Sequence, residues 1–285
     1  MTEDFLWVEK WRPTSISQCV LPHQLKMTFQ SFVDNGKVPN LILSGGPGVG
    51  KTTVARALLN QLDFDYLMIN SSMKGNIDTL RTEIQQFAST VSFNGKRKYV
   101  ILDEADYLNP QSTQPALRNF MEEFSKNCGF ILTCNFKNRI IEPLHSRCSV
   151  IEFNIDKKEK QELCHLFFKR VENILHDNGI VYDKQVVSEL IMKYNPDWRR
   201  ILNELQRYSA TGKIDVGILT VMSDESFTSL VKMLKNQDFS GIRKWVVDNS
   251  DVETSVLYRS LYSNAAKKMP PASIAQMVLI LAKYQ

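Results

Sequence analysis

The stretch GGPGVGKT, at positions 45–52, decides the fold, because it fits the phosphate-loop pattern GxxxxGK[ST]. It follows the apolar run LILS at 41–44 and precedes a segment with helical periodicity at 51–62. Glycines in such a loop let backbone N–H groups point at phosphate oxygens, and the N-terminus of the following helix adds positive charge. Because both flanks are correct, the stretch predicts a nucleotide phosphate site rather than a simple glycine-rich turn.

Two side chains of this loop have predicted roles. Lys51 is expected to neutralise the β- and γ-phosphates, and the hydroxyl of Thr52 is expected to bind Mg²⁺. The expected nucleotide-binding residues of the loop are Gly45, Gly46, Pro47, Gly48, Val49, Gly50, Lys51, Thr52 and Thr53.

Apolar runs and amphipathic segments alternate over residues 40–153. The runs, each short enough to be a strand, lie at 41–44, 66–70, 99–102, 130–134 and 149–153. Helix-like segments lie between them, near 51–62, 77–90 and 111–125. Strands that are apolar on both faces and separated by helices indicate a parallel sheet covered on both sides. The predicted fold class is therefore α/β.

The acidic tetrapeptide DEAD, at 103–106, comes directly after the apolar run that ends at Leu102. A carboxylate at the tip of a neighbouring strand can hold a metal, and the next one can activate a water. We therefore expect Asp103 to bind the metal and Glu104 to act as the base. A solvated acidic loop is the alternative, which the phosphate loop earlier in the chain disfavours.

The pattern becomes helical after Asp156, and no further strand-like run is visible. Asp156 is expected to cap a helix that ends at Gly179, with further helices at 183–194 and 197–208. The tripeptide TGK at 211–213 is typical of a linker. The expected domains are a nucleotide-binding α/β domain at 1–155, a helical lid at 156–213 and a second helical domain at 214–285.

Composition excludes several classes of protein. Hydrophobic residues make up 43% and charged residues 23% of the 285, which argues against disorder. No run approaches the roughly 18 apolar residues of a membrane span, and the first residues lack a signal peptide's apolar core, so we expect a soluble, cytoplasmic protein. The five cysteines form no CxxC pair, which argues against a metal cage. The net charge of +4 is too small to indicate nucleic-acid binding by itself.

Six segments together resemble the AAA+ clamp-loader ATPases, namely replication factor C subunits and, more closely, the large subunit of tailed-phage clamp loaders. Besides the phosphate loop and DEADYLNPQSTQPALRNFMEEFS at 103–125, they are VEKWRP at 8–13, ILTCN at 131–135, LHSRCSVIEF at 144–153 and PDWRRILNELQ at 196–206. The match keeps the family's order from about residue 5 to residue 210. It implies an AAA+ P-loop NTPase sheet domain, a small helical lid and an all-α collar, with ATP and Mg²⁺ as cofactors.

The resemblance implies roles for four groups outside the loop. Asn135, the first sensor, would orient the attacking water, unless it only caps a turn. Arg147 would reach the ATP site of the neighbouring subunit, unless it is an ordinary surface arginine. Arg199, the second sensor, would reach the γ-phosphate from the lid. Arg200 is its rival, and simple solvation of both is the other alternative. The residues that the resemblance assigns to the adenine pocket are Val8, Arg12, Pro13 and Val20, unless this N-terminal segment is only a strap over the core.

DNA is the ligand that the resemblance implies as the activator. Lys74 is the first candidate for a phosphate contact and Arg81 the second. The basic loop at 96–98 is more conspicuous, but we expect it to be a solvated connection.

Three residues are candidates for relaying DNA binding to the ATP site. Asn70 would hold Glu104 away from water until DNA arrives, although a turn-forming asparagine explains it nearly as well. Gln114 and Arg118, in the segment behind Glu104, would pass a DNA contact to the catalytic site or to the next subunit, and helical stacking is the alternative.

The implied function is that of a DNA-stimulated ATPase subunit that opens a sliding clamp, places it on primer-template DNA and releases it on hydrolysis. Its partners would be the clamp, the DNA and related subunits in a five-membered open ring with a distinct partner subunit. The sequence stops at Gln285, short of the family's last collar helix, so either it is partial or the collar is small. Another AAA+ DNA motor, of branch-migration or initiator type, and a non-hydrolysing structural subunit are the alternatives.

Overall fold

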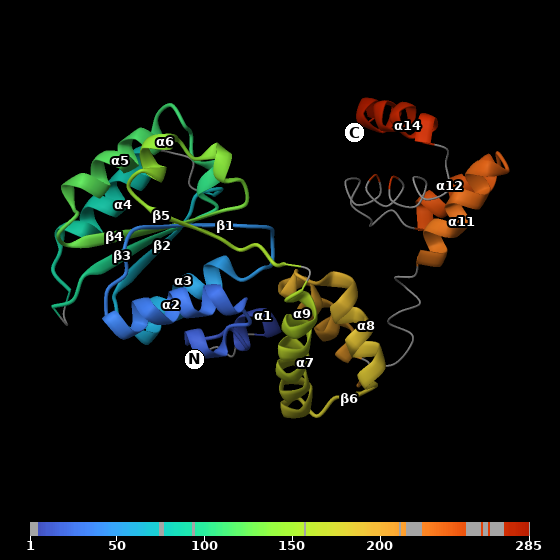
Figure 1. The fold of residues 1–285 in the computed structure, drawn as a ribbon, viewed down its shortest axis with the longest axis horizontal. Coiled ribbons are helices and arrows are strands. Elements are labelled where there is room, and N and C mark those ends of the chain that lie inside the picture. The colour runs from blue at the N-terminus through green and yellow to red at the C-terminus, as the bar shows by residue number, and fades with distance from the viewer. Residues whose placement is uncertain are drawn as a thin grey trace. The chain divides into compact units, whose positions relative to one another are not determined.

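The computed structural model describes residues 5–73, 77–92, 95–156, 158–210, 212–214, 224–248, 258, 262 and 271–284. The chain divides into two compact units, Met1–Asp215 and Val216–Gln285, and each is described by itself. In Figure 1 the first unit contains a sheet with helices on both faces, followed by a group of helices.

A parallel sheet organises the first unit. Its strands are β1 (Leu41–Ser44), β2 (Tyr66–Asn70), β3 (Lys98–Asp103), β4 (Cys128–Cys134) and β5 (Ser149–Glu152). Their order across the sheet is β2-β3-β4-β1-β5. Because β4 lies between β1 and β3, the carboxyl ends of these three strands meet at one edge, where Ser44 pairs with Cys134. On the other side of β3, Asn70 pairs with Asp103.

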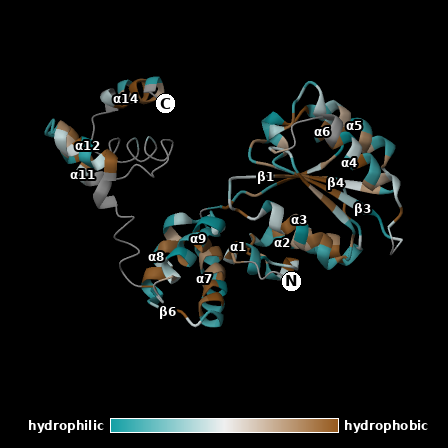
Figure 2. Cartoon of the chain, turned by 180° about the vertical axis from the view of Figure 1, so that it is seen from behind, coloured by the Kyte–Doolittle hydropathy of each residue, from teal (hydrophilic) through white to brown (hydrophobic). Residues whose placement is uncertain are grey.

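Helices cover both faces of this sheet (Figure 1). The helices over the two faces are α2 (His23–Asn35) and α3 (Lys51–Gln61) on one side, and α4 (Ile77–Ser89), α5 (Thr113–Glu123) and α6 (Glu142–His145) on the other. Along β3, Tyr99 and Ile101 enter one apolar cluster, and Val100 and Leu102 enter the other. Both faces of the strand are therefore buried. Figure 2 shows that much of the sheet consists of hydrophobic residues. The predicted α/β class is confirmed.

The lid follows the sheet within the same unit. Its elements are α7 (Lys160–Asp177), β6 (Val181–Tyr182), α8 (Lys184–Tyr194), α9 (Trp198–Ser209) and β7 (Lys213–Ile214). Asp183 caps α8 by accepting the N–H of Gln185, and Asp197 caps α9 by accepting the N–H of Arg200. These caps fix where α8 and α9 begin, close to the predicted positions.

Two local predictions for the lid were wrong. α7 begins at Lys160 and not beside Asp156, because the backbone carbonyl of Asp156 accepts the N–H groups of Glu159 and Lys160 in a turn before the helix. A strand pair also follows residue 156: β6 and β7 pair in parallel, Val181 with Lys213. Lys213 therefore belongs to a strand and not to a linker. Two-residue strands are too short to leave a periodic signal in the sequence.

The prediction of a solvated basic loop at 96–98 was also wrong for two of its residues. Lys98 is buried as the first residue of β3, and its Nζ donates to the carbonyl oxygen of Phe87 at 3.2 Å. Arg97 donates to the carbonyl oxygens of Ser125 and Cys128, at 3.0 and 2.9 Å. These basic side chains satisfy carbonyl oxygens at the ends of other elements, a role that composition alone does not reveal.

The second unit is helical where the structure describes it. Its helices are α11 (Asp224–Lys235), α12 (Phe239–Asp248) and α14 (Pro271–Tyr284). Leu230 and Val231 of α11 and Trp245 of α12 are buried. Among the described helices of the whole chain, none combines the length and the apolar character needed to cross a bilayer.

Candidate nucleotide-binding site

The phosphate loop lies between β1 and α3. Gly48 and Gly50 have φ angles of +71° and +98°, a backbone conformation that favours glycine. Gly50 is the N-cap residue of α3, so the loop ends at the positive end of this helix. The loop thus has both the conformation and the electrostatics of an anion site.

Lys51 begins α3, and its side chain turns back over the loop. Its Nζ donates to the carbonyl oxygens of Gly45 and Gly46, at 2.7 Å each, and to Oδ1 of Asn135 at 2.9 Å. Lys51 is only 8% exposed, and this burial lowers its pKa below the usual value for lysine. A desolvated ammonium held by uncharged acceptors is well prepared to bind a phosphate.

Thr52 and Asp103 join the loop to the end of β3. The hydroxyl of Thr52 donates to Oδ1 of Asp103 at 2.6 Å, and the hydroxyl of Thr133, on β4, donates to the same oxygen at 2.5 Å. A hydroxyl and a carboxylate side by side are the hard oxygen donors that Mg²⁺ prefers. This pair therefore fits a magnesium site.

Asp106 is a buried carboxylate to which the sequence analysis gave no role. Its Oδ2 accepts the N–H groups of Asn135 and Phe136, at 3.2 Å each. Within the described part of the chain, its Oδ1 is buried without a hydrogen-bond partner. Asp106 thus fixes the backbone at the point where Asn135 directs its amide to Lys51. Its place in the DEAD tetrapeptide was a signal that could have found it.

Glu104 and Asn70 lie at the ends of neighbouring strands. Glu104 has the left-handed φ of +56°, and its N–H donates to the hydroxyl of Thr133 at 3.2 Å. Oδ1 of Asn70 accepts the N–H of Ser72 at 2.9 Å and its hydroxyl at 2.7 Å. Asn70 therefore forms a turn of the kind that asparagine favours. Its contact with Glu104 stays a prediction.

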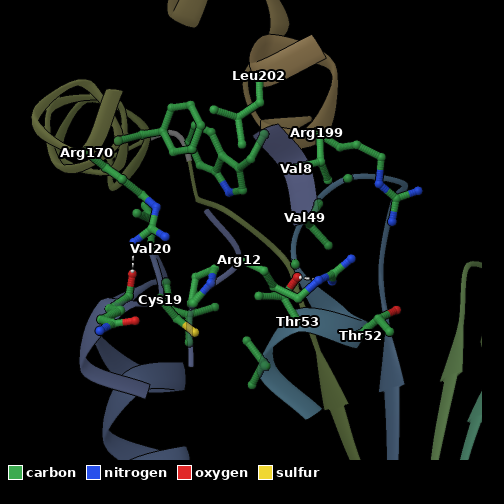
Figure 3. A pocket seen from close by; sticks show the side chains of 18 of the residues that line it. Val8, Arg12, Cys19, Val20, Val49, Thr52, Thr53, Arg170, Arg199 and Leu202 are labelled. Carbon is green, nitrogen blue, oxygen red and sulfur yellow. Dashed lines mark hydrogen bonds between the residues drawn. The ribbon is translucent and has the colours of Figure 1, made fainter. Parts of the chain in front are cut away.

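A pocket lies between the phosphate loop, the N-terminal segment and the lid (Figure 3). Val8, Arg12, Pro13 and Val20 all line it, together with residues 48–53. The residues at 45–47 lie outside its lining. Arg12 donates to the hydroxyl of Thr53 at 2.9 Å and forms an ion pair with Glu9. The sequence-predicted adenine residues and most of the loop thus share one cavity.

The lid supplies walls that the sequence analysis missed. Phe167 of α7 stacks on Trp198 of α9, with ring centroids 4.4 Å apart, and both line the pocket. The other lining residues that we did not predict are Trp11, Gln18, Cys19, Leu21, Val54, Arg170 and Leu202. Helical periodicity cannot separate such side chains from core residues, because a pocket wall and a core give the same pattern.

Arg199 and Arg200 leave the start of α9 in different directions. Arg199 lines the pocket and also an adjoining opening that Thr52 and Asp103 share. In Figure 3 its side chain extends from the lid toward the side of the pocket where Thr52 lies. The guanidinium of Arg200 lies 4.4 Å from the ring centroid of Tyr194. The geometry favours Arg199 over Arg200 as a phosphate ligand.

Arg147 follows α6 and does not line the pocket of its own chain. Its guanidinium pairs with Glu122 of α5, and Nη1 donates to the carbonyl oxygen of Pro143 at 2.8 Å. The hydrogen bond and charge of Arg147 lower the pKa of the exposed Glu122. Arg147 is therefore held at the surface by a solvent-accessible pair.

The remaining candidates differ in burial. Gln114 is fully buried: its Nε2 donates to the carbonyl oxygens of Leu108 and Arg139, and its Oε1 accepts the N–H of Ile141. Arg118, on α5, and Arg81, on α4, are exposed. Lys74 lies outside the described residues.

Two family models match the chain. Residues 41–156 match the ATPase family associated with various cellular activities (AAA), and residues 159–220 match the AAA+ ATPase lid domain of the sliding-clamp-loader large subunit. The sliding-clamp-loader large subunit of Enterobacteria phage T4 is 37% identical over 284 residues, which cover 96% of this chain and 87% of the relative. The chain belongs to the sliding-clamp-loader large-subunit family.

Three further proteins are similar to this chain. The sliding-clamp-loader large subunit of Escherichia phage RB69 is 39% identical over 85% of this chain and 77% of the relative. The replication factor C small subunit of Archaeoglobus fulgidus is 36% identical over 73% of this chain and 65% of the relative. A structure of the Thermotoga maritima RuvB branch migration motor matches with a TM-score of 0.57, over 88% of this chain and 85% of that chain. At 16% identity, it supports the AAA+ fold alone.

Proposed function

We propose that the chain is an ATP-hydrolysing subunit of a sliding-clamp loader. ATP binding would open the clamp and place it on primer-template DNA, and hydrolysis would release it. The observation that carries the proposal is that the start of α3 bonds to two neighbouring strand ends, through Lys51 with Asn135 and Thr52 with Asp103. Membership of the clamp-loader family supports a sliding clamp as the partner.

The residues around the phosphates would have two roles, to bind the phosphate oxygens and to neutralise their charge. Lys51 exchanges the carbonyl oxygens of Gly45 and Gly46 for β- and γ-phosphate oxygens, which relieves its unfavourable burial as a cation. Thr52 and Asp103 would hold Mg²⁺, which screens the charge of the phosphates when bound. Val8, Arg12, Pro13 and Val20 would hold the adenine.

Hydrolysis needs a base and an oriented water. Glu104 takes the proton of the water that attacks the γ-phosphate, and Asn135 orients this water through its amide. Arg199 binds the γ-phosphate from the lid, so the lid angle depends on whether that phosphate is present. Release of the γ-phosphate would break this contact and loosen the grip on the clamp.

Arg147 would act in trans, on the ATP held by the neighbouring subunit of a five-membered open ring that includes a distinct partner subunit. Its position outside its own pocket supports this role. An arginine finger contributes roughly 10³- to 10⁵-fold in rate by stabilising the charge of the transition state. The exposed pair with Glu122 is weak enough to be exchanged for a phosphate.

DNA would contact Lys74 and Arg81 through its phosphates, with Asn70, Gln114 and Arg118 relaying the contact to the ATP site. The exposure of Arg81 and Arg118 is compatible with these roles. The turn made by Asn70 would have to open for that residue to reach Glu104.

The test is steady-state ATP hydrolysis by the purified chain with its partner subunit, with and without the cognate clamp and primer-template DNA. We expect slow hydrolysis alone and a rise of at least about tenfold with both ligands. Stimulation by DNA that never requires the clamp would overturn the clamp-loader function in favour of another DNA motor, and absence of turnover would leave only a structural subunit.

The trans role is tested by mixing two defective chains. Arg147→Ala should bind ATP normally and lose most of the stimulated rate, whereas Arg207→Ala, in an exposed pair with Glu204, is the matched control. Rings that mix Arg147→Ala with Lys51→Ala chains should regain activity, because an intact lysine site then receives an intact arginine. No gain over either parent would overturn the trans assignment.

A further inference from the structure

Arg170 of α7 reaches out of the lid to the N-terminal segment. Its Nη1 donates to the carbonyl oxygen of Gln18 at 3.0 Å, and its Nη2 donates to the carbonyl oxygen of Trp11 at 2.5 Å. Figure 3 shows the side chain descending from the lid along one wall of the pocket, with its hydrogen bond at the far end. One guanidinium thus holds both ends of residues 11–18, which we call the strap.

The surroundings of Arg170 are unusual for a half-buried cation. Within the described residues, no carboxylate forms an ion pair with it, and burial lowers its pKa below the usual value for arginine. Taking a cation partly out of water costs free energy unless acceptors compensate. Its hydrogen bonds go to backbone carbonyl oxygens of the strap. Arg170 therefore fixes the backbone conformation of the strap and forms no salt bridge among the described residues.

The strap contributes directly to the pocket. Trp11, Arg12 and Pro13 line it, and Arg12 also ties the strap to Thr53 of α3. The indole Nε1 of Trp11 is buried and has no hydrogen-bond partner within the described part of the chain. A buried donor without a partner is costly, so the strap carries an unfavourable contact at Trp11 that its other hydrogen bonds have to offset.

The opposite wall belongs to the lid. Phe167, three residues before Arg170, stacks on Trp198 of α9, and both aromatic rings line the pocket. The distance between strap and lid therefore sets the width available to a flat aromatic base. Arg170 spans that distance.

We propose that Arg170 is a positioning residue for the nucleoside part of the nucleotide. It holds the strap, whose residues Trp11, Arg12 and Pro13 line the pocket, at the spacing from Phe167 and Trp198 that admits a purine. Since Arg199 follows Trp198, binding of the base also favours the lid position in which Arg199 faces the phosphates. This inference rests on the proposed function, because it concerns the same ATP.

Different residues would bind the base and the triphosphate of the same nucleotide. The triphosphate is bound by the phosphate loop and Lys51, which Arg170 does not contact. Loss of Arg170 should therefore weaken the binding of ATP but not of inorganic tripolyphosphate, which has no base. A residue that merely stabilised the lid would affect both ligands alike, through Arg199.

The experiment compares the dissociation constants of Mg·ATP and Mg·tripolyphosphate by calorimetry on the full chain. Arg170→Met should weaken ATP binding about tenfold, because two hydrogen bonds from a charged donor are lost, and leave tripolyphosphate within about twofold. Arg170→Lys, which keeps the charge but not the fork of two donors, should lie between. Lys169→Met, at the exposed neighbour on α7, is the control and should change neither constant.

Each result bears on the proposal. Unchanged ATP affinity in Arg170→Met, or equal weakening of both ligands, would overturn it while leaving ATP binding by the chain intact. If Arg170→Met fails to fold, the folded Arg170→Lys decides by the same ratio of the two constants. Failure of the unmodified chain to bind ATP would instead overturn the proposed function, and this inference with it.

Discussion

The carbonyl oxygen of Gly48, in the phosphate loop, accepts a hydrogen bond from the backbone N–H of Trp198 over 3.2 Å. Trp198 is the first residue of α9, so the lid helix that carries Arg199 begins directly on the loop that would cradle phosphate. This hydrogen bond links the loop backbone to the start of the helix that carries Arg199. We therefore expect a change in the loop backbone to shift Arg199.

Gly48→Ala should separate the loop from the lid. A Cβ at this position would lie 1.8 Å from Oδ1 of Asp197 and 3.0 Å from its Cα, and the φ of +71° is also strained for alanine. We expect ATP affinity to fall about tenfold or more, measured by calorimetry. Gly36→Ala is the control, because it has a similar φ of +61° but open space around the new Cβ. Equal losses of ATP affinity in both variants would show that backbone strain, and not the contact of Gly48 with the lid, causes the effect.

Lys51→Met should abolish ATP binding yet stabilise the ligand-free chain at neutral pH. Burial lowers the pKa of Lys51, so the folded state penalises its charged form. The penalty is fully present below the lowered pKa of the folded state, shrinks as the pH rises above it, and is gone above the pKa of the unfolded lysine, about 10.4. We expect a melting temperature about 2–4 °C above that of the unmodified chain at pH 7.

The pH dependence provides the check on this interpretation. The difference in melting temperature between Lys51→Met and the unmodified chain should shrink as the pH approaches about 10. Lys37→Met, at an exposed lysine, should show no such difference at either pH. A less stable Lys51→Met at pH 7 would mean that the hydrogen bonds of Lys51 outweigh its desolvation.

The sheet and the start of α3 could be predicted because their signals are local. The apolar runs at 41–44 and 130–134 become buried parallel strands, and Gly48 and Gly50 of the loop have positive φ. The partners of Arg97, Asp106 and Arg170 could not be predicted, since each bonds to backbone groups that are distant in the chain or belong to a turn. Such contacts depend on how elements pack and leave no periodic trace in the sequence.

Asp106 and Asn135 should behave as one unit in catalysis. Asp106 holds the N–H of Asn135, whose side chain bonds Lys51, so removal of Asp106 should misplace the sensor amide. We expect Asp106→Ala and Asn135→Ala each to lower kcat about 10- to 100-fold, and the double variant to be hardly worse than either. If the loss of kcat in the double variant equalled the product of the two single losses, Asp106 and Asn135 would act independently and this prediction would be wrong. Asp106→Asn keeps an oxygen acceptor and should retain more activity than Asp106→Ala.

Gln114→Ala should destabilise the chain more than alanine substitutions at exposed positions of α5. The change leaves two carbonyl oxygens and the N–H of Ile141 buried without their partner. Unsatisfied buried groups cost about 1–3 kcal/mol each, so we expect a loss of roughly 2–4 kcal/mol in the free energy of unfolding, measured in urea. Arg118→Ala, on the exposed side of the same helix, should change it by less than about 0.5 kcal/mol.

Glu122→Ala and Arg147→Ala should have opposite effects on the assembled ring, although they break the same ion pair. Glu122 competes with the neighbour's phosphate for Arg147, and both side chains are open to solvent, so the pair adds little to stability. Glu122→Ala should therefore leave the melting temperature within about 2 °C and keep or raise the stimulated ATPase rate, at most about fivefold. Arg147→Ala should suppress that rate by roughly 10³-fold or more. If Glu122→Ala rings were as inactive as Arg147→Ala rings, this interpretation would be wrong. Glu122 would then be needed to hold Arg147 in its catalytic position, because loss of the carboxylate alone would abolish the effect of the arginine.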